Sequence, residues 1–158
     1  MPIHHVRKAL TDDDVRTVAR LFAEYATSLP INLDYQDFSG ELARFPGKYS
    51  APGGALFLAI NASGSALGCV GLRPIDKPGC CEMKRLYLLP AARGLGLGRA
   101  LTTALIDEAK RLGYQSLLLD TLPTMSAANA LYQQIGFTRI EPYYAPTPSG
   151  TVFMALTL

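Results

Sequence analysis

The stretch LYLLPAARGLGLGRA, residues 86–100, has residue types suited to binding a phosphate, and the helical run LTTALIDEAKRLG follows it. The stretch contains three alternating glycines, Gly94, Gly96 and Gly98, flanked by Arg93 and Arg99. Glycines permit positive φ and let an anion approach the unpaired N–H groups at a helix N-terminus. The spacing therefore predicts a phosphate cradle made by the backbone. A plain strand-to-helix turn is the alternative.

Two familiar phosphate-binding fingerprints do not fit this loop. A P-loop ends in Gly-Lys-Ser/Thr, but Gly98 is followed by Arg99 and Ala100. The dinucleotide fingerprint GxGxxG needs a glycine at position 99 or 101, and neither position has one. Asp120 nevertheless ends the next expected strand where a ribose-binding acid would lie. A nicotinamide-dependent oxidoreductase therefore stays open as an alternative function.

Two motifs together resemble a known family. The pattern R-x-x-G-x-G, from Arg93 to Gly98, resembles the pyrophosphate loop of the GNAT superfamily of acyl-CoA-dependent N-acyltransferases. The sequence AANALYQQIGF, from Ala127 to Phe137, resembles the second signature of that family, a helix with A-x-x-L-Y that ends in G-F. The resemblance covers nearly all 158 residues, with its sharp motifs between Glu82 and Phe137.

The resemblance implies acetyl-CoA as co-substrate and no metal. It places the coenzyme on the strand, the glycine loop and the second motif: Leu86, Leu88, Arg93, Gly94, Leu95, Gly96, Leu97, Gly98, Arg99, Ala100, Asn129 and Tyr132. Many members have an asparagine seven residues before the tyrosine, where this chain has Met125. Asn129, in a different turn, is the candidate for an amide contact to the pantetheine arm.

The expected chemistry is attack of a neutral amine on a thioester, and the resemblance supplies three catalytic candidates. Glu82 is the candidate general base, acting through a water; a solvated strand glutamate paired with Lys84 or Arg85 is the alternative. The backbone N–H of Leu88 would stabilise the oxyanion. The Tyr132 hydroxyl would protonate the departing thiolate, unless Tyr132 is only a core residue. Strand alternation predicts that Glu82, Lys84, Leu86 and Leu88 share one sheet face.

The acceptor cleft is expected between residues 11–42 and the loop 141–151, as the resemblance implies. The substrate-binding candidates are four tyrosines and two cations: Tyr25, Tyr35, Tyr143, Tyr144, Lys84 and Arg85. The tyrosines could equally be packing residues. The prediction is acetyl transfer from acetyl-CoA to the primary amine of a small molecule, by direct attack in a ternary complex. A non-catalytic acyl-CoA-binding module is a further alternative.

Composition narrows the class of protein without identifying its chemistry. With 158 residues, 49% hydrophobic and 18% charged, the chain is expected to form a single domain, residues 1–158. A net charge of +2 gives no argument for a nucleic-acid partner. No apolar stretch is long enough for a membrane span or a secretion signal, which predicts a cytoplasmic protein. Three cysteines without CxxC spacing indicate neither a disulfide framework nor a zinc site. Homodimer formation stays open.

The elements that must position these residues alternate along the chain. Strands are expected at HHVRKAL, ALFLAI, ALGCVGL, Cys80–Leu89 and QSLLLD, with two more around EPYYAPTPSG. Helices are expected from Thr11, around Tyr35–Leu42, over 97–112 and over 125–135. This order predicts a mixed α/β fold with helices on both sheet faces. The GNAT-like form of it is a mostly antiparallel sheet that splays at the strand before the glycine loop.

Overall fold

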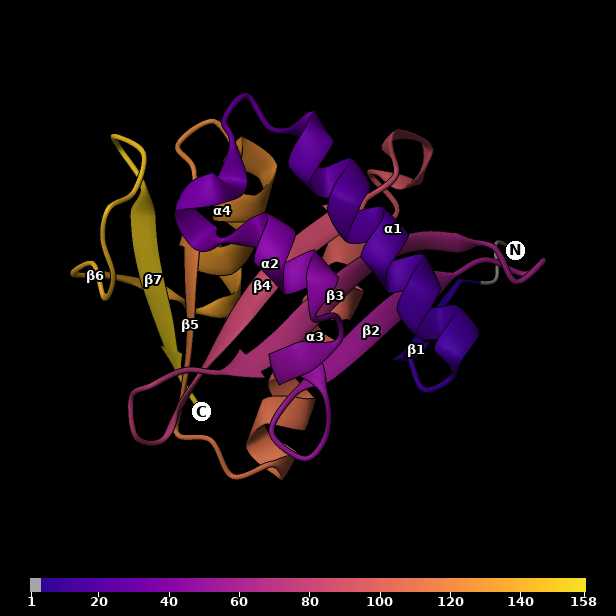
Figure 1. Ribbon diagram of the computed structural model, residues 1–158, viewed down its shortest axis with the longest axis horizontal. Helices are drawn as coiled ribbons and strands as arrows, with labels where there is room; N and C mark the ends of the chain where they lie inside the picture. The colour runs from indigo at the N-terminus through magenta and orange to yellow at the C-terminus, as the bar shows by residue number, and fades with distance from the viewer. Residues whose placement is uncertain (1–3) are drawn as a thin grey trace.

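The computed structural model describes residues 4–158 and contains one seven-stranded sheet in the order β1-β2-β3-β4-β5-β7-β6 (Figure 1). The strands are β1 His5–Lys8, β2 Ala55–Ile60, β3 Ala66–Pro74, β4 Cys80–Leu88, β5 Ser116–Thr121, β6 Thr138–Ile140 and β7 Val152–Thr157. Every neighbouring pair is antiparallel except β4 and β5. The predicted mixed sheet is therefore confirmed.

The two parallel strands separate after a short paired stretch. Residues Cys80–Glu82 of β4 pair with Ser116–Leu118 of β5, and the pairing ends there although both strands continue. The sheet is thus open between the C-terminal halves of β4 and β5, as the family resemblance implied. A gap of this kind leaves room for a ligand between two strands of one sheet.

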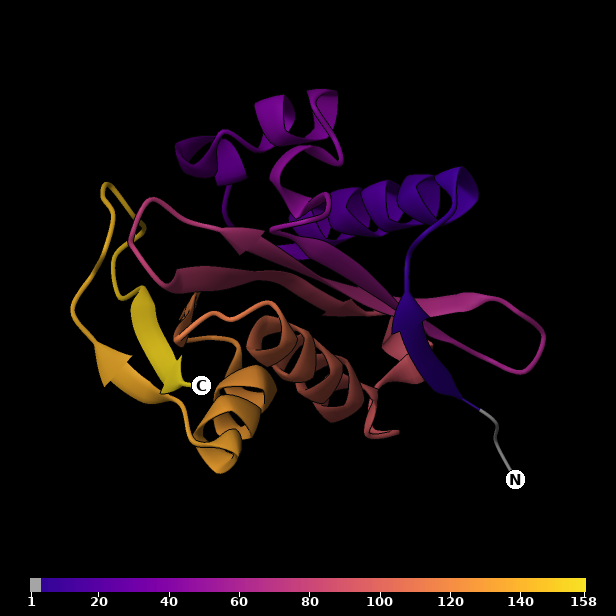
Figure 2. The ribbon, with the colours of Figure 1, turned by 90° about the horizontal axis from the view of Figure 1, so that it is seen from below.

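Helices cover both faces of the sheet, as predicted (Figure 2). One face carries α1 Asp12–Ser28 and α2 Phe38–Ala43, and the other carries α3 Leu97–Arg111 and α4 Ser126–Ile135. Short 3₁₀ turns complete the chain: η1 Leu33–Gln36, η2 Gly47–Tyr49 and η3 Pro90–Ala92. The second expected helix is therefore split into η1 and α2, at Asp37, whose φ of 53° lies in the left-handed region. No helix in residues 4–158 is both long and apolar enough to cross a membrane.

Local signals account for the ends of the long helices. The side chain of Thr11 accepts a hydrogen bond from the Asp14 N–H, and the Asp14 carboxylate accepts one from the Thr11 N–H, which is a capping box. Helix α3 ends just before Gly113, whose φ of 87° suits glycine at this position. Both termini follow the predicted pattern because each depends on residues close in sequence.

A bulge in β4 overturns the predicted alternation of its side chains. Lys84 pairs with Gly71 and Tyr87 with Cys69, so β4 has one extra residue between them, and Arg85 there has a φ of 61°. Glu82 and Lys84 consequently lie on the face of α1 and α2, whereas Leu86 and Leu88 pack with the core beneath α3. The expectation of one shared face is wrong because a one-residue insertion reverses every later side chain.

Candidate active site

The glycine loop gives helix α3 an uncapped N-terminus. Gly94 and Gly96 have φ values of 82° and 80°, and a Cβ at either position would meet no atom within 4 Å. The first intrahelical bond runs from the Ala100 N–H to the Gly96 carbonyl, and no side chain caps the helix. The first amides of α3 therefore remain available for an anion. This geometry fits the predicted diphosphate cradle.

Other residues of the loop differ in their roles. Gly98 lies inside α3 without the positive φ of Gly94 and Gly96, and it lines the cleft described below. The Arg93 Nε donates to the Leu88 carbonyl at 3.2 Å and links the loop to β4. Arg99 donates to the Gln134 side chain at 2.7 Å, which links α3 to α4. Both arginines are exposed, and each brings a positive charge next to the proposed phosphate site.

A cleft of about 610 Å³, the glycine-loop cleft, runs from this cradle into the opening between β4 and β5. Its walls come from α1, β4, the glycine loop and α4, including Tyr25, Leu86, Leu88, Arg93, Gly94, Gly98, Met125 and Leu131. The Leu89 N–H pairs with the Leu67 carbonyl of β3. Because antiparallel ladders alternate, the Leu88 N–H points away from β3 and toward the opening. That orientation suits the predicted oxyanion donor.

Helix α4 presents a different face from the one expected. Leu131 lines the glycine-loop cleft, whereas Tyr132 is only 6% exposed and packs in the core against Phe137 with a ring separation of 5.6 Å. Residue spacing along α4 predicts that Leu131 packs against the sheet and that Tyr132 lies along the cleft edge, and the structure shows the opposite. Burial raises the pKa of Tyr132 above its usual value. Its phenol stays protonated at neutral pH.

Asn129 and Met125 stand where α4 meets β5. The Asn129 amide oxygen accepts from the Thr121 hydroxyl at 2.8 Å, and its nitrogen donates to the Leu122 carbonyl at 3.1 Å. The side chain thus joins α4 to the end of β5. Met125 lines the glycine-loop cleft itself, at the position where the family often has an asparagine. A contact of Asn129 to the coenzyme remains a prediction.

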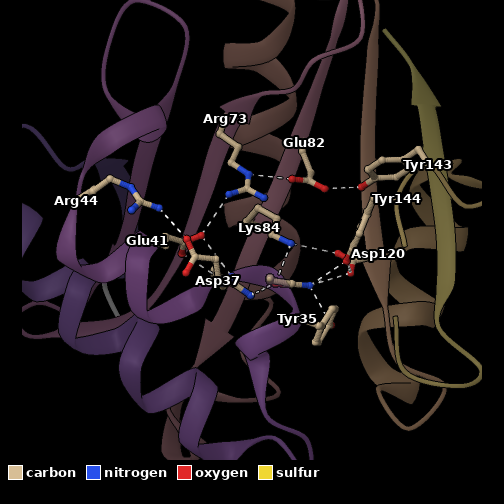
Figure 3. A network of polar contacts seen from close by, with 12 residues as sticks. Tyr35, Asp37, Glu41, Arg44, Arg73, Glu82, Lys84, Asp120, Tyr143 and Tyr144 are labelled. Carbon is tan, nitrogen blue, oxygen red and sulfur yellow. Dashed lines mark hydrogen bonds and ion pairs between the residues drawn. The ribbon is translucent and has the colours of Figure 1, made fainter. Parts of the chain in front are cut away.

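A second cleft, the polar cleft of about 590 Å³, lies on the α2 face and contains Glu82. Glu82 is 2% exposed; one of its oxygens accepts from Arg73 Nε at 2.9 Å and the other from the Tyr143 hydroxyl at 2.6 Å (Figure 3). Arg73 also contacts Glu41 at 3.2 Å. The alternative of an exposed glutamate paired with Lys84 or Arg85 is therefore wrong. Both oxygens are held in place by β3 and by the loop before β7.

Lys84 and Asp120 bridge the opening between β4 and β5. The Lys84 Nζ lies 3.4 Å from Asp120 Oδ1 and 3.1 Å from the Gln36 amide oxygen, and Asp120 accepts from the Tyr144 hydroxyl (Figure 3). Burial lowers the pKa of Lys84. Burial would raise the pKa of Asp120, but the Lys84 ammonium and the Tyr144 hydroxyl lower it. Asp120 is therefore a carboxylate.

The six substrate-binding candidates are distributed over three places. Tyr35, Lys84, Tyr143 and Tyr144 line the polar cleft. Tyr25 faces the glycine-loop cleft, packs edge-on against Tyr87 and has a pKa raised to about 12 by burial. Arg85 does not line the polar cleft; it lines a small neighbouring cavity and contacts Glu41 at 3.3 Å and Gln36 at 2.6 Å.

Sequence reasoning missed four side chains that line the polar cleft or contact residues that line it: Gln36, Glu41, Arg73 and Asp120. Only Asp120 gave a signal, as a carboxylate at the end of an apolar strand, and it was assigned to the nicotinamide alternative. In the structure Asp120 contacts Lys84, Gln36 and Tyr144. The other three have no local pattern that marks them, since their partners lie on distant elements.

Comparison with known proteins agrees with this architecture. A splayed sheet with a glycine-cradled helix defines an acyl-CoA-dependent acetyltransferase class, and residues 17–137 match the model of the acetyltransferase (GNAT) family. The chain belongs to that family and is an acyl-CoA N-acetyltransferase. This assignment replaces both the nicotinamide enzyme and the non-catalytic module as alternatives.

Individual relatives show how far the likeness extends. An uncharacterised N-acetyltransferase of Schizosaccharomyces pombe is 41% identical over 145 residues, which is 92% of this chain and 89% of that protein. The N-acetylaspartate synthetase of Danio rerio is 28% identical over 78% of this chain and 46% of its own length. A crystal structure of a GNAT-family acetyltransferase from Staphylococcus aureus superposes with a TM-score of 0.78 and 21% identity, covering 98% of this chain and 99% of that one. The last likeness concerns the fold alone.

Proposed function

We propose that the protein transfers an acetyl group from acetyl-CoA to the primary amine of a small molecule, by direct attack within a ternary complex. The observation that carries the proposal is the meeting of two clefts at the opening between β4 and β5. The glycine-loop cleft reaches this opening from one side and the polar cleft, with Glu82, from the other. An acyl donor and an amine can therefore approach each other without a covalent enzyme intermediate.

The residues around the glycine-loop cleft would hold the coenzyme. The free amides between Gly94 and Arg99 would bind its diphosphate, since the Ala100 N–H is already bonded to the Gly96 carbonyl. Leu95 lies at the exposed rim, and Arg93 and Arg99 add charge. Leu86, Leu88 and Leu97 provide apolar contacts near β4 and the start of α3. When bound, the coenzyme supplies a thioester, whose carbonyl carbon is the electrophile.

Three groups of the chain would then carry the reaction, two by transferring protons and one by stabilising a negative charge. Glu82 takes a proton from the acceptor ammonium through a water, and the freed amine forms the N–C bond. The Leu88 N–H stabilises the oxyanion. The C–S bond then breaks, the Tyr132 hydroxyl donates its proton to the departing thiolate, and the second proton of the attacking nitrogen passes through water to the tyrosinate. Because burial raises the pKa of Tyr132, the phenol is protonated at neutral pH but is a weaker acid than a thiol, so this donation depends on the prompt reprotonation of the tyrosinate.

Two further observations support a small acceptor. The polar cleft is lined by η1 and by the loop containing Tyr143 and Tyr144, and its volume of about 590 Å³ suits a small molecule. In addition, the Danio rerio relative is named for making N-acetylaspartate, an acetylated amino acid. We therefore favour a small amine over the tail of a protein.

The test is an assay of free coenzyme A thiol with acetyl-CoA and a panel of amines, combined with calorimetric titration of coenzyme A and acetyl-CoA. We expect micromolar to millimolar binding of the coenzyme and acceptor-dependent release of thiol. The acylated product is identified by mass spectrometry. Binding of acetyl-CoA with acetylation of protein substrates, but of no small amine, would contradict the small-molecule acceptor.

A further inference from the structure

A small cavity connects the two clefts, and the side chain of Gln36 closes it. This junction cavity has a volume of about 30 Å³, comparable to one water molecule. It shares Tyr25, Leu29 and Met125 with the glycine-loop cleft, and Tyr35, Gln36 and Lys84 with the polar cleft. An acceptor nitrogen must enter this cavity to reach an acyl group on the other side. The side chains that contact the Gln36 amide would therefore also contact the reacting amine.

The nitrogen of Gln36 has more oxygen partners than it has hydrogens. Its Nε2 lies 3.0 Å from the Tyr35 hydroxyl, 3.1 Å from Asp120 Oδ2 and 3.0 Å from the Tyr144 hydroxyl. A primary amide nitrogen carries two hydrogens, whereas a primary ammonium carries three. One of the three oxygens belongs to an ionised carboxylate, which binds a cationic donor more strongly than a neutral one. The surroundings of this nitrogen thus match an ammonium group.

The oxygen of Gln36 faces two buried cations. Its Oε1 accepts from Lys84 Nζ at 3.1 Å and from the Arg85 guanidinium at 2.6 Å. Both side chains are at most 5% exposed. Two cationic donors on one neutral amide oxygen are the surroundings expected for a carboxylate. The amide of Gln36 therefore lies with its nitrogen in an ammonium-like position and its oxygen in a carboxylate-like position.

The charge balance of the cluster favours a ligand with no net charge. Three cations stand against three carboxylates: Arg73, Lys84 and Arg85 against Glu41, Glu82 and Asp120. A bare ammonium would bring one unbalanced positive charge into this buried network, and a bare carboxylate one negative charge. A zwitterion leaves the balance unchanged while it satisfies both sides.

We propose that the junction cavity is the site for the ammonium and carboxylate of an α-amino acid, which displaces the amide of Gln36 on binding. Asp120, Tyr35 and Tyr144 hold the ammonium, and Lys84 and Arg85 hold the carboxylate. The amino acid's own side chain extends into the polar cleft. Gln36 is the last residue of the single turn η1. The inference rests on the proposed function and names its substrate class.

A direct test follows the side-chain NH₂ signals of Gln36 by NMR in the ¹⁵N-labelled protein saturated with coenzyme A. The signals are assigned by their loss in Gln36→Ala. Each of three amino acids is titrated against the amine that lacks only its carboxylate: phenylalanine against phenethylamine, tyrosine against tyramine, and lysine against cadaverine. Phenylalaninamide, which keeps the oxygen but loses its charge, is a further control.

We expect at least one amino acid to move the Gln36 signals toward solvent-exposed values, at a concentration about tenfold or more below its matched amine and amide. If amino acids and amines act alike, or if none moves the signals, the proposal is wrong. This readout needs no turnover. A protein that acetylates amines without preferring amino acids would uphold the acetyltransferase function and overturn only this inference.

Two variants separate the halves of the site. Gln36→Ala removes the competing amide, so the KM for the amino acid should fall while the KM for acetyl-CoA stays the same. Lys84→Met removes one carboxylate donor and should reduce the preference for amino acid over amine by about tenfold. Calorimetric binding of coenzyme A checks that each variant is folded. A higher KM for the amino acid in Gln36→Ala would contradict the proposal, because it would mean that Gln36 contacts the bound substrate and is not displaced by it.

Discussion

Glu82 has a carboxylate that is fixed from two sides, and its replacement by glutamine preserves the size of the side chain. If Glu82 is the base, Glu82→Gln should lower turnover far more at neutral pH than at high pH, where the acceptor amine loses its proton unaided. The measurement is kcat from about pH 6 to 10 with a saturating acceptor.

Glu41→Gln is the matched control for this variant. Glu41 contacts the same Arg73, but it does not line the polar cleft. It should change turnover by a constant factor across the pH range. A constant ratio of parent to Glu82→Gln over that range would instead show that Glu82 positions Arg73 and Tyr143 or binds the substrate.

Tyr132 contributes one hydroxyl from a buried ring, and Tyr132→Phe removes only that group. We expect acetyl-CoA affinity to stay nearly unchanged and turnover to fall by about 10²-fold or more. The loss should shrink with a thioester of a more acidic thiol, which needs less protonation. Tyr25→Phe is the comparison, since Tyr25 lines the glycine-loop cleft itself. A larger loss in Tyr25→Phe would transfer the role of proton donor to Tyr25.

At the scale of the elements, the glycine loop requires a positive φ at Gly96. At Gly96, with a φ of 80°, a Cβ meets no neighbour, so Gly96→Val costs only backbone strain, about 1–2 kcal/mol in unfolding free energy. The branched side chain would also stand where a phosphate approaches the amides of α3. Acetyl-CoA binding, measured by calorimetry, should weaken by about tenfold or more.

The turn between β2 and β3 offers a control with the same backbone geometry. Gly64 has a φ of 85° and equally open surroundings, but it does not line either cleft. Gly64→Val should lower the unfolding free energy by a similar amount and leave acetyl-CoA affinity intact. Normal binding by Gly96→Val would remove the loop from the coenzyme site.

At the scale of the whole molecule, an ion pair between Glu108 and Lys8 joins α3 to the edge strand β1. Hydrogen bonds from Arg111, and then from Lys8 of β1, lower the pKa of Glu108 to about 2 despite its burial. A depressed pKa gives stability that is complete above the usual carboxyl value and is lost as the pH falls toward 2. Glu108→Gln should therefore cost about 1 kcal/mol at neutral pH, a small value because both cations are partly solvated.

Urea unfolding at neutral pH and near pH 3 measures this effect. The parent should lose more stability between the two pH values than Glu108→Gln does. Asp107→Asn is the control, since Asp107 is exposed on the same helix. This substitution removes the same negative charge but none of the ion pairs that Glu108 makes with Lys8 and Arg111. Equal pH dependence in the parent and in Glu108→Gln would contradict the linkage.

The sequence by itself determined the features that depend on neighbouring residues. The glycine loop, the capped start of α1 and the hairpin between β2 and β3 all follow from residues a few positions apart, because backbone dihedrals and turn hydrogen bonds are local. The same reasoning located Glu82 and the α4 motif. It could not orient them.

Only the tertiary structure decided which faces and partners these residues have. The bulge at Arg85 reverses the end of β4, and α4 turns Tyr132 inward and Leu131 toward the cleft. Gln36 meets Asp120 and Tyr144 across separations of 84 and 108 residues. Strand register and helix rotation are set by how distant elements pack, so no pattern within one segment encodes them.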